Sequence, residues 1–160
     1  MAKEQALRQA IADAVAQLAT VNWTSRCPRL GLGEPTGGTL ALRMFGGNYR
    51  LTLDDLSLTN RDNGKEAKPA DQLLLLHYLA CESALSPGQE LISFRTFCGG
   101  EFYYQPFCSR TREPLLKRFG NDVDGLRASL DHFDWEPVAT GDLGARIHAL
   151  GVLSVTLVYR

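Results

Sequence analysis

Hydrophobic residues recur at helical spacing near the start of the chain. Their intervals of four, three and four residues place them on one face of a helix, and they are Leu7, Ile11, Ala14 and Leu18. We therefore expect an N-terminal helix over residues 3–21. From residue 22 to residue 38 this periodicity stops and Pro and Gly become frequent, which predicts a loop.

Two segments of alternating apolar and polar residues come next. They cover residues 39–45 and 48–53, and Gly46 and Gly47 join them. Because glycine adopts positive φ without steric cost, a two-glycine connection between such segments predicts a β-hairpin. A polar stretch with a turn at residues 60–64 follows it.

A strongly apolar helix is predicted at residues 70–84. Pro69 suits its first turn, and Ser86-Pro87-Gly88 marks its end. Leu73 to Leu76 and Leu79 make it apolar on nearly all sides, so we expect it to lie centrally in the fold.

The segment from residue 91 to residue 120 concentrates aromatic residues. Alternation predicts a strand at 91–97 and a returning strand at 101–104, joined by the glycine pair at 99–100. After Pro106, a helix capped by Ser109 or Thr111 is expected to end at Gly120. Asp122 is expected to cap a further helix.

Three more strands are predicted, over residues 135–138, 143–150 and 152–159. The fold class is therefore α+β, with a mixed, mainly antiparallel sheet of five to seven strands and about four packed helices. One domain over residues 1–160 is expected for this length. The last strand reaches the final residue, so we expect either a clipped chain or a partner at that edge, such as a second copy.

Composition narrows the classes of function. The 17 basic and 18 acidic residues give a net charge of -1, which argues against a nucleic-acid partner and against a basic membrane-binding surface. No stretch of 18 apolar residues and no signal-peptide pattern is present. We therefore expect a cytoplasmic protein.

The four cysteines do not form a CxxC pair, so a zinc ribbon or an iron–sulfur cluster motif is not supported. In a reducing compartment we expect four free thiols. Cys98 and Cys108 flank the predicted hairpin at residues 91–104, and a disulfide or a shared metal between them stays an alternative.

The aromatic segment also supplies the candidate ligand-binding residues. Arginine binds carboxylates and phosphates bidentately and stacks on rings, which suits a planar anion. The guanidinium groups expected to line such a pocket are those of Arg95, Arg110, Arg112 and Arg146, and the rings are those of Tyr103, Tyr104 and Phe107. The alternative is that these arginines form structural ion pairs with Glu101, Glu113 and Asp142.

His77 stands inside the apolar helix, where a satisfied core histidine is the simplest interpretation. Two functional alternatives involve it. One is general-base catalysis by His77 or His148 with Asp142 or Glu101. The other is a metal site in which His77 and Cys81, four residues apart on one helix, act with Cys98 or Cys108.

Several blocks together resemble a known family. They are LLLLHYL, SFRTF, GGEFYYQPF, SRTREPLLKRFG and GDLGARIHAL. Over about residues 39–160 the chain resembles the DUF3786 domain, an uncharacterised family of anaerobic bacteria and archaea for which no reaction is established. Some relatives are joined to a small domain that carries a four-iron–four-sulfur cluster, and the cysteines here do not match that cluster motif.

The resemblance matches the family pattern at particular positions. They are His77, Arg95, Gly99, Gly100, Tyr103, Phe107, Arg110, Phe119, Gly120, Gly141, Asp142 and Arg146. Relatives continue past the last strand into an acidic, aromatic segment with a further histidine. That segment is not in this sequence, so a site to which it contributes would be differently closed here.

These observations lead to one functional hypothesis and two alternatives. The first is a non-catalytic cytoplasmic domain that binds an anionic small molecule, a cofactor or a redox partner such as an iron–sulfur protein in anaerobic metabolism. The second is an enzyme that uses a pocket around His77, Arg95 and Arg146. The third is a structural interaction module that docks, or forms a homodimer, through its terminal strand. The cofactor and any reaction stay open.

Overall fold

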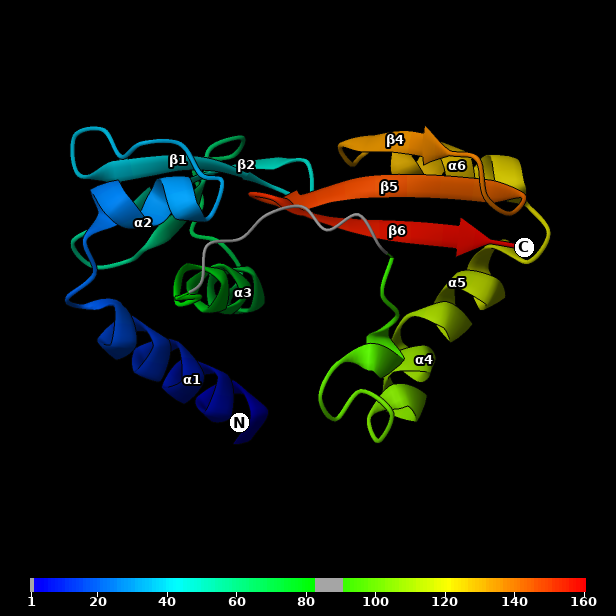
Figure 1. Cartoon of the computed structure of the whole chain (residues 1–160), viewed down its shortest axis with the longest axis horizontal. Coiled ribbons are helices and arrows are strands. Elements are labelled where there is room, and N and C mark those ends of the chain that lie inside the picture. Colours follow the sequence, from blue (N-terminus) through cyan, green and yellow to red (C-terminus); the bar gives the residue numbers. More distant parts are fainter. Residues whose placement is uncertain (1, 83–90) are drawn as a thin grey trace. The chain divides into compact units, whose positions relative to one another are not determined.

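The computed structural model describes residues 2–82 and 91–160 (Figure 1). The chain separates into two compact units. Unit 1 comprises Met1–Pro87 and His148–Ser154, and unit 2 comprises Gly88–Ile147 and Val155–Arg160. The expectation of a single domain over residues 1–160 stays a prediction.

Unit 1 contains three helices and a three-stranded antiparallel arrangement. The helices are α1 (Ala2–Leu18), α2 (Trp23–Arg29) and α3 (Pro69–Leu79), and the strands are β1 (Thr39–Met44), β2 (Gly47–Thr52) and β3 (Leu58–Asn60). The predicted N-terminal helix and hairpin are confirmed. The turn lies at Phe45 and Gly46, with φ of +48° and +84°, one residue earlier than the predicted Gly46–Gly47 connection, because Gly47 pairs with Met44 and begins β2. The short strand β3 was not predicted. The helix predicted over residues 70–84 is shorter than expected, because α3 ends at Leu79 with Ala80 as its C-cap. The predicted stop at residues 86–88 lies outside the described residues.

Helix α2 corrects the prediction of a loop over residues 22–38. The side chain of Asn22 caps this helix by accepting a hydrogen bond from the backbone N–H of Ser25 at 3.2 Å. Cys27 is fully buried and anchors the helix to the core. Pro28 lies inside the helix, where it removes a backbone donor. Pro28 and the glycines that follow it are residues that usually interrupt helices, so the sequence pattern predicted a loop and the helix start at Asn22 was missed.

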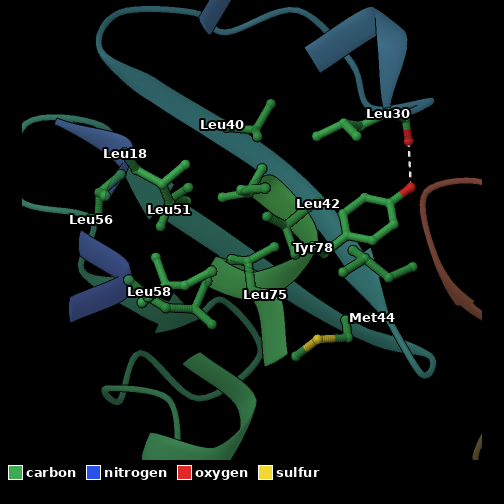
Figure 2. Packing of buried hydrophobic residues seen from close by; sticks show 14 of the residues in the cluster. Leu18, Leu30, Leu40, Leu42, Met44, Leu51, Leu56, Leu58, Leu75 and Tyr78 are labelled. Carbon is green, nitrogen blue, oxygen red and sulfur yellow. Dashed lines mark hydrogen bonds between the residues drawn. The ribbon is translucent and has the colours of Figure 1, made fainter. Parts of the chain in front are cut away.

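The core of unit 1 forms where α3 meets the strands, α1 and α2 (Figure 2). Leu40, Leu42 and Leu51 come from β1 and β2 and pack with Leu75 of α3. Full burial of each leucine side chain contributes roughly 1.5–3 kcal/mol relative to exposure. The expectation that the apolar helix is central is therefore confirmed for unit 1.

Unit 2 contains a 3-10 turn, three helices and most of three strands. These elements are η1 (Phe94–Thr96), α4 (Tyr104–Arg110), α5 (Arg112–Phe119), α6 (Val123–Leu130), β4 (Trp135–Val138), β5 (Leu143–Leu150) and β6 (Leu153–Tyr159). The end of β5 and the start of β6 count with unit 1. Asp122 caps α6 as predicted, because its Oδ1 accepts from the backbone N–H of Gly125 at 2.9 Å.

A second hydrophobic core lies in unit 2. Its buried residues are Leu126, Leu130, Leu143, Ala145 and Tyr159. The hydroxyl of Tyr159 donates to the backbone oxygen of Gly120 at 2.5 Å, so this buried ring keeps a partner for its polar end.

The strands hydrogen-bond in the order β3-β2-β1-β5-β4, and β6 pairs with β5. The recorded pairs of β1 with β2 and β5, of β2 with β3 and of β4 with β5 are antiparallel. Together with the helices, this sheet confirms the predicted α+β class.

The predicted hairpin at residues 91–104 is wrong. Residues 94–96 form η1, and Tyr104 already begins α4. The glycine pair does turn the chain, with Gly99 at φ +74°. The segment alternates like a strand, but its rings stack on one another between η1 and α4, and none of the described strands pairs with it.

Candidate functional site

A tight turn brings two distant parts of the aromatic segment together. The backbone N–H of Gly100 donates to the Phe97 carbonyl at 2.8 Å. A Cβ atom at Gly100 would lie 2.1 Å from the carbonyl oxygen of Phe94, a distance that no side chain tolerates. Glycine is therefore required here for the chain to fold back over η1, and the next residue, Glu101, is carried toward Arg95.

Arg95 and Glu101 form a bidentate ion pair. The Arg95 Nε and Nη2 atoms lie 2.6 Å and 2.7 Å from the two carboxylate oxygens of Glu101. The guanidinium carbon also lies 5.0 Å from the centre of the Tyr104 ring, within cation–π range. We call Arg95, Glu101 and Tyr104 the Arg95 clamp.

The ion pair shifts the ionisation of both partners. The hydrogen bonds that Arg95 donates to Glu101 raise the pKa of Arg95 and lower the pKa of Glu101. Both side chains are more than half exposed, at 55% and 68%. An exposed ion pair adds little to folding stability. Because both side chains are exposed, the carboxylate of a ligand is able to reach the Arg95 guanidinium from solvent.

A stack of rings supports the clamp. Phe94 and Phe107 lie face to face, with ring centres 4.1 Å apart and planes 4° from parallel. Tyr104 lies 6.4 Å from Phe107, and Phe97 contacts Phe94 edge-on. These contacts tie η1 to α4 and hold the Tyr104 ring beneath the Arg95 guanidinium.

A second arginine contacts a ring nearby on α4. The Arg110 Nη1 donates to the Tyr103 hydroxyl at 2.9 Å, and its guanidinium carbon lies 5.6 Å from the centre of that ring. The stretch from residue 91 to residue 103, before α4, also exposes large apolar side chains. They are Leu91, Ile92, Phe97, Phe102 and Tyr103, with Phe102 92% exposed.

A family model described as a domain of unknown function (DUF3786) matches residues 24–160. The chain belongs to the DUF3786 family. No curated protein and no solved structure matches the chain.

The match of the DUF3786 model begins at residue 24, within α2. The family region therefore starts earlier than the resemblance over residues 39–160 indicated. It includes the Arg95 clamp and most of the core of unit 1, but not Ala14 and Leu18, which α1 contributes to that core.

The structure brings five of the seven predicted site residues into direct contacts within unit 2. Arg95, Tyr104 and Phe107 belong to the clamp and its ring stack, while Tyr103 pairs with Arg110. The alternative of a structural bridge between Arg95 and Glu101 is also confirmed.

Arg146 lies on β5, directly opposite Glu136 on β4. Its Nη1 atom forms an ion pair with the Glu136 carboxylate at 2.8 Å. The carboxylates expected for such bridges were those of Glu101, Glu113 and Asp142, whereas the observed partner of Arg146 comes from the neighbouring strand. That Arg146 converges with the ring segment stays a prediction.

His77 is exposed on α3 in unit 1, so its interpretation as a core histidine is wrong. Its neighbours Leu76 and Tyr78 are buried, because an apolar helix still turns one narrow stripe to solvent. No group of three or more His, Cys, Asp or Glu residues within 2–82 and 91–160 is placed to hold a metal ion.

One contributor to the site was not recognised from the sequence. Phe94 supplies the ring that stacks on Phe107. Glu101, which was expected as an alternative ion-pair partner of the arginines, supplies the carboxylate that pairs with Arg95. No signal of periodicity pairs Phe94 with Phe107, because the tertiary packing of η1 on α4 creates that contact.

All four cysteines are free thiols, with Cys27 and Cys108 buried and Cys98 exposed. Burial raises the pKa of Cys27, so this thiol stays protonated and unreactive at neutral pH. None of the described helices is long and apolar enough to cross a membrane.

Proposed function

We propose that this DUF3786 domain is a non-catalytic binding domain for an organic anion, and that the Arg95 clamp is its binding site. The observation that carries this proposal is the bidentate pairing of the Arg95 guanidinium with the Glu101 carboxylate, at 2.6 Å and 2.7 Å, on the face of Tyr104. Glu101 stands where the carboxylate of a ligand would bind.

The ligand class follows from the chemistry of the clamp. A guanidinium with two parallel donors matches a carboxylate better than it matches a neutral group. The rings around it favour a ligand that also carries a flat apolar part. We therefore propose a carboxylate next to an aromatic or conjugated group. Binding requires that the ligand displaces Glu101, which the exposure of both side chains allows.

The setting of this function is part of the proposal. The free thiols fit a reducing compartment, and we place the protein in the cytoplasm. The DUF3786 resemblance supports a ligand that is a cofactor or metabolite of anaerobic metabolism.

The test observes the Arg95 Nε–H group directly by nuclear magnetic resonance. Benzoate, phthalate, citrate and inorganic phosphate are titrated into the protein. We expect benzoate and phthalate to move the Arg95 Nε–H signal more than phosphate does, because they combine a carboxylate with a ring. Glu101→Gln should tighten their binding several-fold because the internal competitor is removed. Arg95→Gln should abolish it, as followed through the backbone N–H signals of Glu101 and Tyr104, which report binding in every variant.

Arg118 provides a matched control. Its guanidinium carbon also lies over a ring, 5.2 Å from the centre of Phe119. Arg118→Gln should leave the binding of benzoate unchanged. The proposal is refuted if the aromatic carboxylates fail to move the Arg95 signal even in Glu101→Gln, or if Arg118→Gln weakens binding as much as Arg95→Gln.

A further inference from the structure

The last strand, β6, has a free edge among the described strands, because its only strand partner is β5. An edge strand presents unpaired backbone N–H and C=O groups, and proteins usually protect such edges with lysine, proline or a bulge. The sequence of β6 is LSVTLVY, which has no charged residue and no proline. Leu153 and Val155 are 47% and 51% exposed.

The hydrogen bonds show which backbone groups of β6 face outward. The Tyr159 carbonyl accepts from the backbone N–H of Asp142, next to the start of β5. The Ala149 carbonyl on β5 accepts from the backbone N–H of Phe45, which directly follows β1. The backbone groups of the residues next to Ala149 in β5 therefore face β6. Because consecutive residues of a strand bond to opposite sides, the outward groups of β6 belong to Ser154, Thr156 and Val158.

We propose that β6 pairs antiparallel with β6 of a second copy of this chain, with the two-fold axis at Thr156. In this register Thr156 faces its own equivalent, and Ser154 faces Val158 of the second copy. The outward groups then form about six backbone hydrogen bonds.

The same register matches the side chains. Val155 comes opposite Leu157 of the second copy, and Leu153 comes opposite Tyr159, so the exposed apolar side chains on one face meet apolar partners. No like charges oppose each other, since Arg160 comes opposite Val152. A second copy is thus complementary to β6 along the whole strand.

A charge-swap experiment tests both the partner and the register. Sedimentation equilibrium of the wild-type chain should show a concentration-dependent dimer. Thr156→Lys and Thr156→Glu should each be monomeric, because like charges would lie directly opposite each other. An equimolar mixture of the two variants should form a dimer again. Thr156→Val is the matched control and should dimerise like wild type.

A second measurement needs no variant of β6. In wild-type protein, the backbone N–H groups of Ser154, Thr156 and Val158 should exchange with deuterium more slowly as the protein concentration rises. Phe102→Ser tests the other exposed apolar segment and should leave the dimer intact. A wild-type chain that stays monomeric up to about 100 μM, a mixture that does not recover, or a dimer lost in Phe102→Ser and retained in Thr156→Lys would each overturn the proposal.

Discussion

The buried hydroxyl of Tyr78 joins three separate parts of unit 1. It donates to the backbone oxygen of Leu30 at 2.5 Å and accepts from the backbone N–H of Val152 at 3.2 Å (Figure 2). The Tyr78 side chain is only 6% exposed. Burial raises the pKa of Tyr78, so the hydroxyl keeps its proton at neutral pH and remains able to donate.

Tyr78→Phe should remove both hydrogen bonds while the ring continues to fill the core. Each bond contributes about 1 kcal/mol, and buried groups left without a partner cost about 1–3 kcal/mol. We therefore expect the free energy of unfolding to fall by about 2 kcal/mol, with a decrease in Tm of about 5 °C. Urea unfolding followed by circular dichroism measures this loss, and the m-value should not change.

A substitution at Gly151 tests the same Tyr78 contact independently. Its φ is +57°, and a Cβ atom there would lie 2.1 Å from the Tyr78 hydroxyl oxygen. Gly151→Ala should therefore be destabilising, and less so in a Tyr78→Phe background, where the nearest clashing atom is gone. The double variant should lose less stability than the two single variants together.

The control for Tyr78→Phe is Tyr103→Phe. The Tyr103 hydroxyl also has a hydrogen bond, from Arg110, but the side chain is 45% exposed. Its loss should cost less than about 0.5 kcal/mol. The reasoning is refuted if the two tyrosine variants lose equal stability, or if the effects of Tyr78→Phe and Gly151→Ala simply add.

Two further predictions concern the core and the clamp. Leu75→Ala should reduce the free energy of unfolding by about 2–5 kcal/mol, because Leu75 is fully buried. Its neighbour Leu74 is 46% exposed, and equal losses in Leu74→Ala by urea unfolding would contradict this assignment. For the clamp, Arg95 lowers the pKa of Glu101. The Arg95–Glu101 pair therefore contributes to folding stability at pH values above the ordinary glutamate pKa of about 4.3. That contribution is lost as the pH falls through the lower pKa of Glu101 in the folded state. The Arg95 Nε–H signal should follow that transition with a midpoint below about pH 4.3. In Glu101→Gln the signal should not respond to acid. A midpoint at the ordinary glutamate pKa would disprove the pairing.

The local pattern of the sequence was sufficient to predict those elements whose formation depends on residues near one another in the chain. The spacing from Leu7 to Leu18 predicted α1, and the glycine pair at 46–47 predicted the β1–β2 hairpin. Asp122 predicted the start of α6. In each case a few neighbouring residues supply the periodicity, the turn or the cap that the element needs.

Other features depended on contacts between residues far apart in the chain. The alternation at residues 91–104 suits a strand, but the stacking of Phe94 on Phe107 stabilises η1 and α4 instead. Likewise, the choice of Glu136 as the partner of Arg146 follows from the register of β4 and β5.

The sequence by itself thus determined the fold class, the principal helices of unit 1 and the residue types available for binding an anion. Only the tertiary structure decided that Arg95 is engaged by Glu101 and that His77 faces solvent. The physical reason is that periodicity, turns and caps act over a few residues, whereas exposure and ion pairing depend on which surfaces the folded chain brings together.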